Sequence, residues 1–168
     1  MTAIDNEIAL LSSVKHEADL VINTSLLNLH QLRNIISTDV LSKSSAQLSL
    51  IFQSFGFKHG QPASTDFMFD VRCLPNPYWE PELREFTGRD EPIIDFLSDQ
   101  QNVQDMFSDI EAYVSRWLPS FENENRSYLT VSIGCTGGRH RSVYLCEMLT
   151  AHFGAIRENV SIRHREIS

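Results

Sequence analysis

The sequence predicts an α/β fold in which a mostly parallel sheet is flanked by helices. Short apolar segments typical of buried strands alternate along the chain with longer segments of helical periodicity. An apolar segment over residues 128–133 runs into a glycine-rich turn, and a helix-like segment over 143–153 follows it. The apolar share of 42% and the charged share of 21% are those of a globular protein.

Residues 1–45 form the first of two predicted domains. A piece of this size cannot bury its own apolar faces, so we expect the end of a larger α/β domain and association into a homo-oligomer. A polar junction at residues 43–45 predicts the boundary with a second domain over 46–168. The expected elements are a helix through about residue 18, a strand over 19–23, a cap at Thr24 and Ser25, and a helix over 28–36.

The second domain, residues 46–168, alternates strands with helices, which favours parallel pairing. The prolines between residues 74 and 81 fix φ, exclude the helix and hold a stiff loop at the end of a strand. The expected elements are strands over 48–55 and 67–72, helices over about 92–97 and 103–118, a turn over 122–125, a strand over 128–133, a helix over 143–153, and a short edge strand over 160–162.

Residues 134–142, with the sequence GCTGGRHRS, predict a phosphate-binding loop. A glycine turn between a strand and a helix directs several backbone N–H groups and the positive end of the helix dipole toward one point, which favours an anion. Two adjacent glycines let the main chain approach a ligand, and Arg139 and Arg141 can add charged hydrogen bonds.

Other interpretations of this loop remain open. The spacing from Cys135 to Arg141, with Ser142 next, resembles that of the cysteine-dependent phosphatases, in which a thiolate attacks phosphorus. However, Gly134 replaces the histidine that usually precedes their cysteine, and no aspartate loop is an obvious general acid. A tight strand-to-helix turn with arginines facing solvent is a further alternative. A zinc site of Cys135, His140 and His164 has no recognisable ligand spacing, so we expect no metal.

A second set of polar side chains follows the strand over 67–72. Asp70, Arg72 and Asn76 lie where that strand ends, at the edge of a parallel sheet where ligands bind. They are well placed to reach a small polar ligand. An equally open interpretation is that Asp70 and Arg72 only pair with each other.

The net charge of −8 is unevenly distributed along the chain. From residue 126 onward six arginines stand against three acidic residues, whereas residues 50–125 carry fourteen acidic residues against five basic ones. A basic C-terminal part beside a phosphate loop favours a surface for polyanions, with an ordinary solvated surface as the alternative. Within that part, residues 163–165 (Arg-His-Arg) are expected to be exposed at the end of the edge strand.

The sequence gives no sign of a membrane protein. No segment approaches the ~18 uninterrupted apolar residues of a membrane span, and the N-terminal residues lack the basic start of a signal peptide. Cys73, Cys135 and Cys146 are an odd number of cysteines without metal-type spacing, which fits a reducing compartment. We therefore expect a cytoplasmic protein.

Six motifs, in order along nearly the whole chain, resemble the RNase adapter protein RapZ family. The motifs are SFGFKHG over 54–60, FDVR over 69–72, LPNP over 74–77, Thr87-Gly88, NRSYL over 125–129, and the loop over 134–142. Residues 18–22 and 29–33 also resemble the end of that family's N-terminal, P-loop kinase-like domain.

The resemblance implies a C-terminal domain of phosphofructokinase-like α/β layout that senses glucosamine-6-phosphate and binds small regulatory RNAs, presenting one RNA to an endoribonuclease. The implied RNA-binding residues are Arg139, Arg163, His164 and Arg165. The implied ligand-binding residues are Thr136, Gly137, Gly138, His140, Arg141 and Ser142 around the phosphate, with Asp70, Arg72, Asn76 and Cys135 completing the pocket.

The chain departs from the family pattern in three places. No Gly-x4-Gly-Lys-Ser/Thr motif occurs, so we expect ATP and GTP only as ligands of the full-length family and no cofactor in this chain. Tyr78 replaces the histidine that follows Pro-Asn-Pro in RapZ, so we expect any sugar contact at this position to change. The chain stops at Ser168 without that protein's strongly basic tail, so we expect RNA affinity that is lower or that belongs only to an assembled oligomer. We accordingly expect a binding and regulatory module, with a cysteine phosphatase using Cys135 and Arg141 as the alternative.

Overall fold

The computed structural model describes Glu7, Leu11, residues 22–25, Leu27, Leu32, and residues 48–124 and 126–167. Contacts along the chain divide it into two units, residues 1–46 and residues 47–168. In the first unit, Asn23 Oδ1 accepts a hydrogen bond from the Ser25 N–H at 3.0 Å. The elements that the sequence predicts over residues 1–45 lie largely outside the described residues, so the origin of this segment in a nucleotide-binding domain stays a prediction.

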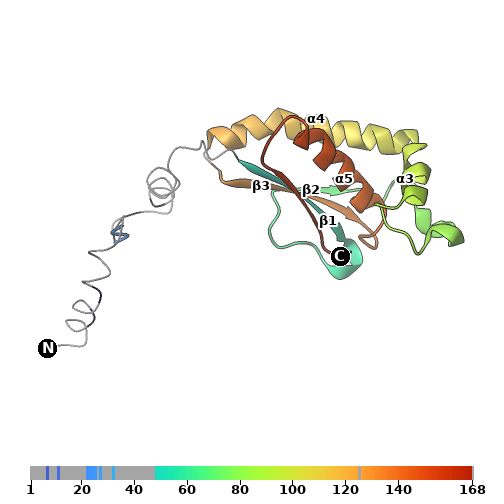
Figure 1. Ribbon diagram of the computed structural model, residues 1–168, viewed down its shortest axis with the longest axis horizontal. Coiled ribbons are helices and arrows are strands. Elements are labelled where there is room, and N and C mark those ends of the chain that lie inside the picture. Colours follow the sequence, from blue (N-terminus) through green and yellow to red (C-terminus); the bar gives the residue numbers. More distant parts are fainter. Residues whose placement is uncertain are drawn as a thin grey trace. The chain divides into compact units, whose positions relative to one another are not determined.

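The strands of the second unit are β1 (Ser49–Gly56), β2 (Phe67–Asp70), β3 (Tyr128–Cys135) and β4 (Val160–His164). Among the described residues they form one four-stranded sheet in the order β2-β3-β1-β4, with every neighbouring pair parallel (Figure 1). In this register Gly56 pairs with Cys135, and Asp70 pairs with Gly134. The predicted parallel α/β fold is therefore confirmed, and β4 is an edge strand as expected.

The α-helices α3 (Glu91–Ser98), α4 (Gln101–Asn123) and α5 (Arg141–Gly154) follow strands along the chain. Figure 1 shows α4 and α5 on the same face of the sheet. Alternate residues of the central strands, such as Phe52 and Val131, join Ile110 of α4 and Leu149 of α5 in one apolar core. Since burying apolar side chains is the dominant favourable term in folding, this core holds the helices on the sheet.

Two boundaries differ from the expectation because of local polar contacts and core packing. The strand expected over 67–72 ends at Asp70, since the Asp70 carboxylate accepts from the Arg72 N–H at 3.0 Å and turns the chain. The turn expected over 122–125 begins later, at Glu124, because α4 continues to Asn123. The Phe121 ring packs edge-to-face on Phe67 with 5.4 Å between ring centroids, a tertiary contact that overrides the local turn signal.

The expectation that the prolines between residues 74 and 81 exclude helical structure is wrong. Two short 3-10 helices, η3 (Pro77–Trp79) and η4 (Pro81–Leu83), begin there with a proline in the first turn. A proline at that position loses nothing, because its missing N–H has no partner within the helix in any case. Across the described ranges, no helix is both long enough and apolar enough to cross a membrane.

Candidate functional site

The candidate site lies at the carboxyl edge of the sheet. All strand pairs are parallel, so β1 ends at Gly56, β2 at Asp70 and β3 at Cys135 along the same edge. In open α/β sheets, ligands bind in the crevice outside this edge. The sheet therefore brings together the three loops that the sequence motifs occupy.

The loop over residues 136–140 joins β3 to α5, and its turn is held by Cys135. The Gly138 N–H donates to Cys135 Sγ at 3.2 Å, and Ser142 Oγ also lies 3.2 Å from that sulfur. Gly138 has φ 74°, a left-handed conformation that glycine adopts without strain. The loop thus delivers its chain directly to the first residue of α5, Arg141, where the helix dipole is positive.

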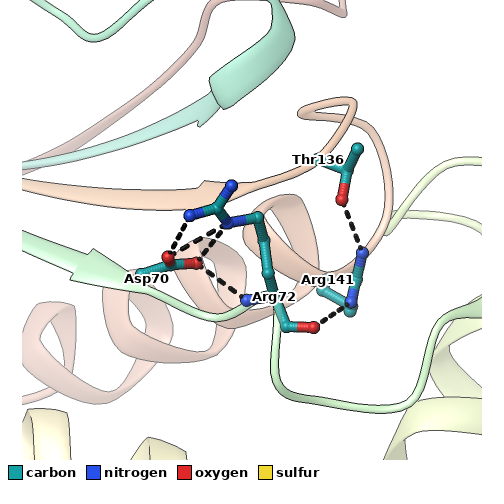
Figure 2. A network of polar contacts seen from close by, with 4 residues as sticks. All are labelled: Asp70, Arg72, Thr136 and Arg141. Carbon is teal, nitrogen blue, oxygen red and sulfur yellow. Dashed lines mark hydrogen bonds and ion pairs between the residues drawn. The ribbon is translucent and has the colours of Figure 1, made fainter.

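Arg141 is buried, with 4% of its surface exposed, and its guanidinium bridges two loops. Nη1 donates to the main-chain oxygens of Arg72 and Leu74, both at 2.9 Å, and Nη2 lies 3.4 Å from Thr136 Oγ1 (Figure 2). Within the described residues Arg141 Nε is buried without a hydrogen-bond partner. This cation is therefore held by neutral oxygens and retains an unused donor.

Asp70 and Arg72 form an ion pair beside Arg141. Arg72 Nη2 lies 2.7 Å from Asp70 Oδ2, and Nε lies 3.0 Å from both carboxylate oxygens (Figure 2). Hydrogen bonding from the Arg72 side chain is the main reason that the pKa of Asp70 lies below its usual value. The Arg72 guanidinium also lies over the Phe57 ring at 4.1 Å. The structure thus shows the ion pair between Asp70 and Arg72, one of the two interpretations that the sequence left open. Both side chains remain about half exposed.

Asn76 and His140 serve the local structure of the two loops. Asn76 Oδ1 caps η3 by accepting from the Tyr78 N–H at 3.4 Å. The buried His140 donates from Nε2 to the main-chain oxygen of Phe86 at 2.9 Å. Burial is the main cause that lowers the pKa of His140, so this ring is neutral near pH 7. His140 therefore ties the 84–88 loop to the phosphate loop and contributes no charge.

Lys58 is a residue that the sequence reasoning missed as a site residue. Its N–H donates to the main-chain oxygen of Thr136 at 3.2 Å. Its Nζ lies 3.8 Å from the position that a Cβ on Gly137 would occupy. The ammonium group therefore lies beside Gly137, the first of the two adjacent glycines of the phosphate loop. Its place directly after the end of β1 is a signal that could have suggested it.

The expected RNA-binding residues divide into two kinds. Arg139, Arg163 and Arg165 are exposed, and Arg139 and Arg165 each donate a hydrogen bond to a main-chain oxygen. The expectation that His164 is exposed is wrong, because its side chain is only 3% exposed. Its Nδ1 lies 2.7 Å from Ser54 Oγ, and its Nε2 lies 3.1 Å from Glu147 Oε1. The register of β4 on β1 turns this side chain inward.

The other interpretations of the loop meet specific obstacles in the structure. A Cβ at Gly134 would lie 2.4 Å from a ring atom of Phe55 and 2.6 Å from one of Phe57, so no histidine fits before Cys135. Over the described ranges, no three side chains of His, Cys, Asp or Glu are grouped so that they could hold a metal ion. Cys135, His140 and His164 instead bond to Ser142, Phe86 and Glu147, respectively.

Known proteins resemble this chain over nearly its whole length. Residues 48–168 match the family model described as the RapZ C-terminal domain. A nucleotide-binding protein of Cellvibrio japonicus is 50% identical over 98% of this chain and 56% of its own length. Proteins of that description from Thioalkalivibrio sulfidiphilus and Pseudomonas syringae are 54% and 52% identical over 99% of this chain, in each case covering 58% of the relative.

The chain thus spans a little over half the length of the curated relatives it matches. The family match covers the whole sheet and every loop of the candidate site. The six sequence motifs and the observed parallel sheet lead to the same conclusion as the match. This chain belongs to the RapZ family, and its residues 48–168 form that family's C-terminal domain.

Proposed function

We propose that this chain is a binding and regulatory module that takes the phosphate group of a small metabolite on the 134–142 loop and RNA on the adjoining basic surface. The observation that carries the first part is Arg141. A buried guanidinium that retains an unused donor at a helix N-terminus is compatible with an anion, since an anion would supply the charge partner that the neutral oxygens do not.

The proposed phosphate ligands are Arg141, its neighbour Thr136, Lys58 and the N–H groups of the first turn of α5. Thr136 Oγ1 and the Arg141 fork lie within hydrogen-bonding distance of each other, and Lys58 extends along Gly137 from the neighbouring loop. The N–H groups of the first turn of α5 add the positive end of the helix dipole. A phosphate here would receive charged hydrogen bonds, each worth about 1.5–3 kcal/mol.

The proposed metabolite is an amino-sugar phosphate, most simply glucosamine-6-phosphate. Asp70 is the candidate contact for the ammonium group of the sugar. It lies at the end of β2, which pairs with β3, and its side chain is 44% exposed. The hydrogen bonds of Arg72 keep the pKa of Asp70 low, so the carboxylate stays charged while it accepts a further donor. The side chain of Tyr78, a residue that is 54% exposed, would face the sugar in place of the family's histidine.

The proposed RNA surface consists of Arg139, Arg163 and Arg165, with Lys58 at its margin. Exposed arginines and lysines neutralise backbone phosphates without reading sequence, so binding of this kind weakens steeply as salt rises. The proposed partners are a small regulatory RNA and an endoribonuclease, within a homo-oligomer. Relatives are named nucleotide-binding proteins; we propose that ATP or GTP binding belongs to the part of those relatives that this chain does not cover.

The proposal is tested by calorimetric titration with glucosamine-6-phosphate, with glucose-6-phosphate and inorganic phosphate as comparisons. Selective binding of the amino sugar is expected, and Arg141→Ala should weaken it about tenfold or more, which corresponds to ~1.4 kcal/mol. Equal binding of all three ligands would reduce the site to a general anion loop. Undiminished affinity in the Arg141 variant would show that the phosphate lies elsewhere.

A cysteine-dependent phosphatase is the second candidate, and one observation favours it. Cys135 Sγ accepts the Gly138 N–H and lies 3.2 Å from Ser142 Oγ, so the loop turns around the sulfur of this cysteine. The crowding at Gly134 and the 3% exposure of Cys135 argue against it. Turnover of an aryl phosphate that disappears in Cys135→Ser would establish this activity, whereas a binding module shows no turnover in either protein.

A further inference from the structure

The described residues after β4 continue alongside the end of β1 and the segment that follows it, and three contacts tie them there. Glu166 Oε2 accepts a hydrogen bond from the Gly56 N–H at 3.1 Å. The Arg165 N–H donates to the main-chain oxygen of Ser54 at 3.2 Å, and Arg165 Nη1 donates to that of Gly60 at 2.9 Å. Figure 1 shows this end of the chain beside the segment that follows β1.

The Glu166 carboxylate also lies against the phosphate loop. A Cβ built on Gly138 would be 2.5 Å from Glu166 Oε2 and 2.6 Å from the Gly56 nitrogen. The carboxylate therefore occupies the side of Gly138 on which any other residue would carry its side chain. Only 11% of the Glu166 side chain is exposed, so this is an internal contact.

Gly56 completes the contact between the two segments. A Cβ at Gly56 would lie 2.7 Å from the carbonyl carbon of Gly137 and 2.9 Å from the Gly138 nitrogen. The end of β1 thus packs directly on the main chain of the two adjacent loop glycines. Glu166 closes this packing from the other side, since it bonds the Gly56 N–H and touches Gly138.

We propose that Glu166 is a positioning residue for the anion loop, acting through Gly56 and Gly138. Without the carboxylate, the Gly56 N–H loses its acceptor and the left-handed turn at Gly138 loses its packing support. The turn at Gly138, whose N–H donates to Cys135 Sγ, is then no longer held from the side of β1. The inference rests on the proposed function for its effect on ligand binding, while the structural part stands on the contacts themselves.

Two variants and a matched control separate the role of the carboxylate from that of its charge. Glu166→Ala removes the acceptor, whereas Glu166→Gln keeps an oxygen that can accept from Gly56 at nearly the same volume. Glu158→Ala makes the same change in net charge at an exposed residue that does not line the loop. Each protein is titrated calorimetrically with inorganic phosphate and with glucosamine-6-phosphate.

The expected result is a loss of affinity for both ligands of about fivefold or more in Glu166→Ala, about the effect of one lost hydrogen bond. Glu166→Gln should restore most of the affinity, and Glu158→Ala should bind as the unaltered protein does. Unchanged affinity in Glu166→Ala overturns the proposal. Tighter phosphate binding in both Glu166 variants also overturns it, since the carboxylate would then act by repelling the anion.

A second measurement tests the positioning role of Glu166 even if the unaltered protein binds no phosphate and the proposed function therefore fails. The amide resonances of Gly56, Gly137 and Gly138 report the loop conformation directly in solution. They are expected to shift in Glu166→Ala and to exchange their protons faster, but to stay close to their original positions in Glu166→Gln. Unmoved glycine resonances in Glu166→Ala overturn the positioning role whatever the ligand experiment shows.

Discussion

Gly88 donates its N–H to the main-chain oxygen of Arg139 at 2.8 Å and lies directly against the first turn of α5. A Cβ at this position would be 2.4 Å from both the His140 oxygen and the Tyr144 nitrogen. These are backbone atoms of a buried helix, which cannot rotate aside. The approach of the 84–90 segment to the phosphate loop therefore depends on the absence of a side chain at Gly88.

Gly88→Ala is expected to destabilise the protein by about 1–3 kcal/mol, because the added methyl group forces a backbone shift. Gly154→Ala is the matched control, since no described atom lies within 4 Å of its Cβ position at the end of α5. That change should be neutral or slightly stabilising, because alanine favours the helix. Chemical denaturation followed by circular dichroism measures both. Equal losses at the two sites would contradict the close packing of Gly88.

Gly138→Ala is expected to be more harmful than Gly60→Ala, although both glycines have a positive φ, 74° and 87°. At Gly60, where ψ is 151°, the cost is backbone strain of about 1–3 kcal/mol, because no described atom lies within 4 Å of an added Cβ. At Gly138 the Cβ also meets Glu166 Oε2 at 2.5 Å. Thermal unfolding and phosphate affinity should both fall further in the Gly138 variant. Equal stability of the two variants would mean that the loop yields freely around Glu166.

Mild acid is expected to destabilise the protein through His140 and His164. Burial is the main cause that lowers the pKa of both below the ordinary 6.5. Below about pH 6.5 the unfolded state therefore binds protons that the folded state does not. Stability is full above that pH and is lost as pH falls through the folded pKa values.

Denaturant unfolding at pH 7.5 and pH 5.5 measures this dependence. His140→Gln and His164→Gln should each reduce the difference between the two pH values, because each removes one of the titrating groups. An unaltered protein whose stability is the same at both pH values would rule out the contribution of these rings.

The three thiols are expected to react at different rates. Cys73 is exposed, whereas Cys135 and Cys146 are buried, and burial raises the pKa of the Cys146 thiol well above its usual value. An aromatic disulfide reagent should therefore modify one thiol rapidly in the native protein, and Cys73→Ser should abolish that phase. Rapid modification of Cys135 in the Cys73 variant would favour the phosphatase alternative.

The parts of the structure that the sequence predicts are those encoded locally. Alternating apolar segments predict the parallel sheet, and the run over 134–142 predicts a strand, a glycine turn and a helix start, because neighbours along the chain determine all three. The expected loop at residues 74–81 is present. Its two 3-10 helices could not be predicted, because a proline is compatible both with extended backbone and with the first turn of a helix.

The remaining features depend on residues that are distant in the sequence. Glu166 meets Gly138 only because β4 pairs with β1 and places the residues that follow β4 beside Gly56. The burial of His164 follows from the same pairing, since its partners Ser54 and Glu147 lie on other elements. No pattern in a single sequence gives the strand order β2-β3-β1-β4, so neither contact could be inferred from it.

The placement of β1 in the sheet also has a consequence for synthesis of the protein. Both neighbours of β1, the strands β3 and β4, are translated long after it, beginning at Tyr128 and Val160. While the ribosome makes the intervening residues, the apolar side chains of β1, Phe52 among them, have no strand to pair with. Such late, non-local pairing makes folding slow and leaves a nascent chain open to aggregation. We therefore expect β1 to complete its pairing only after β4 has left the exit tunnel.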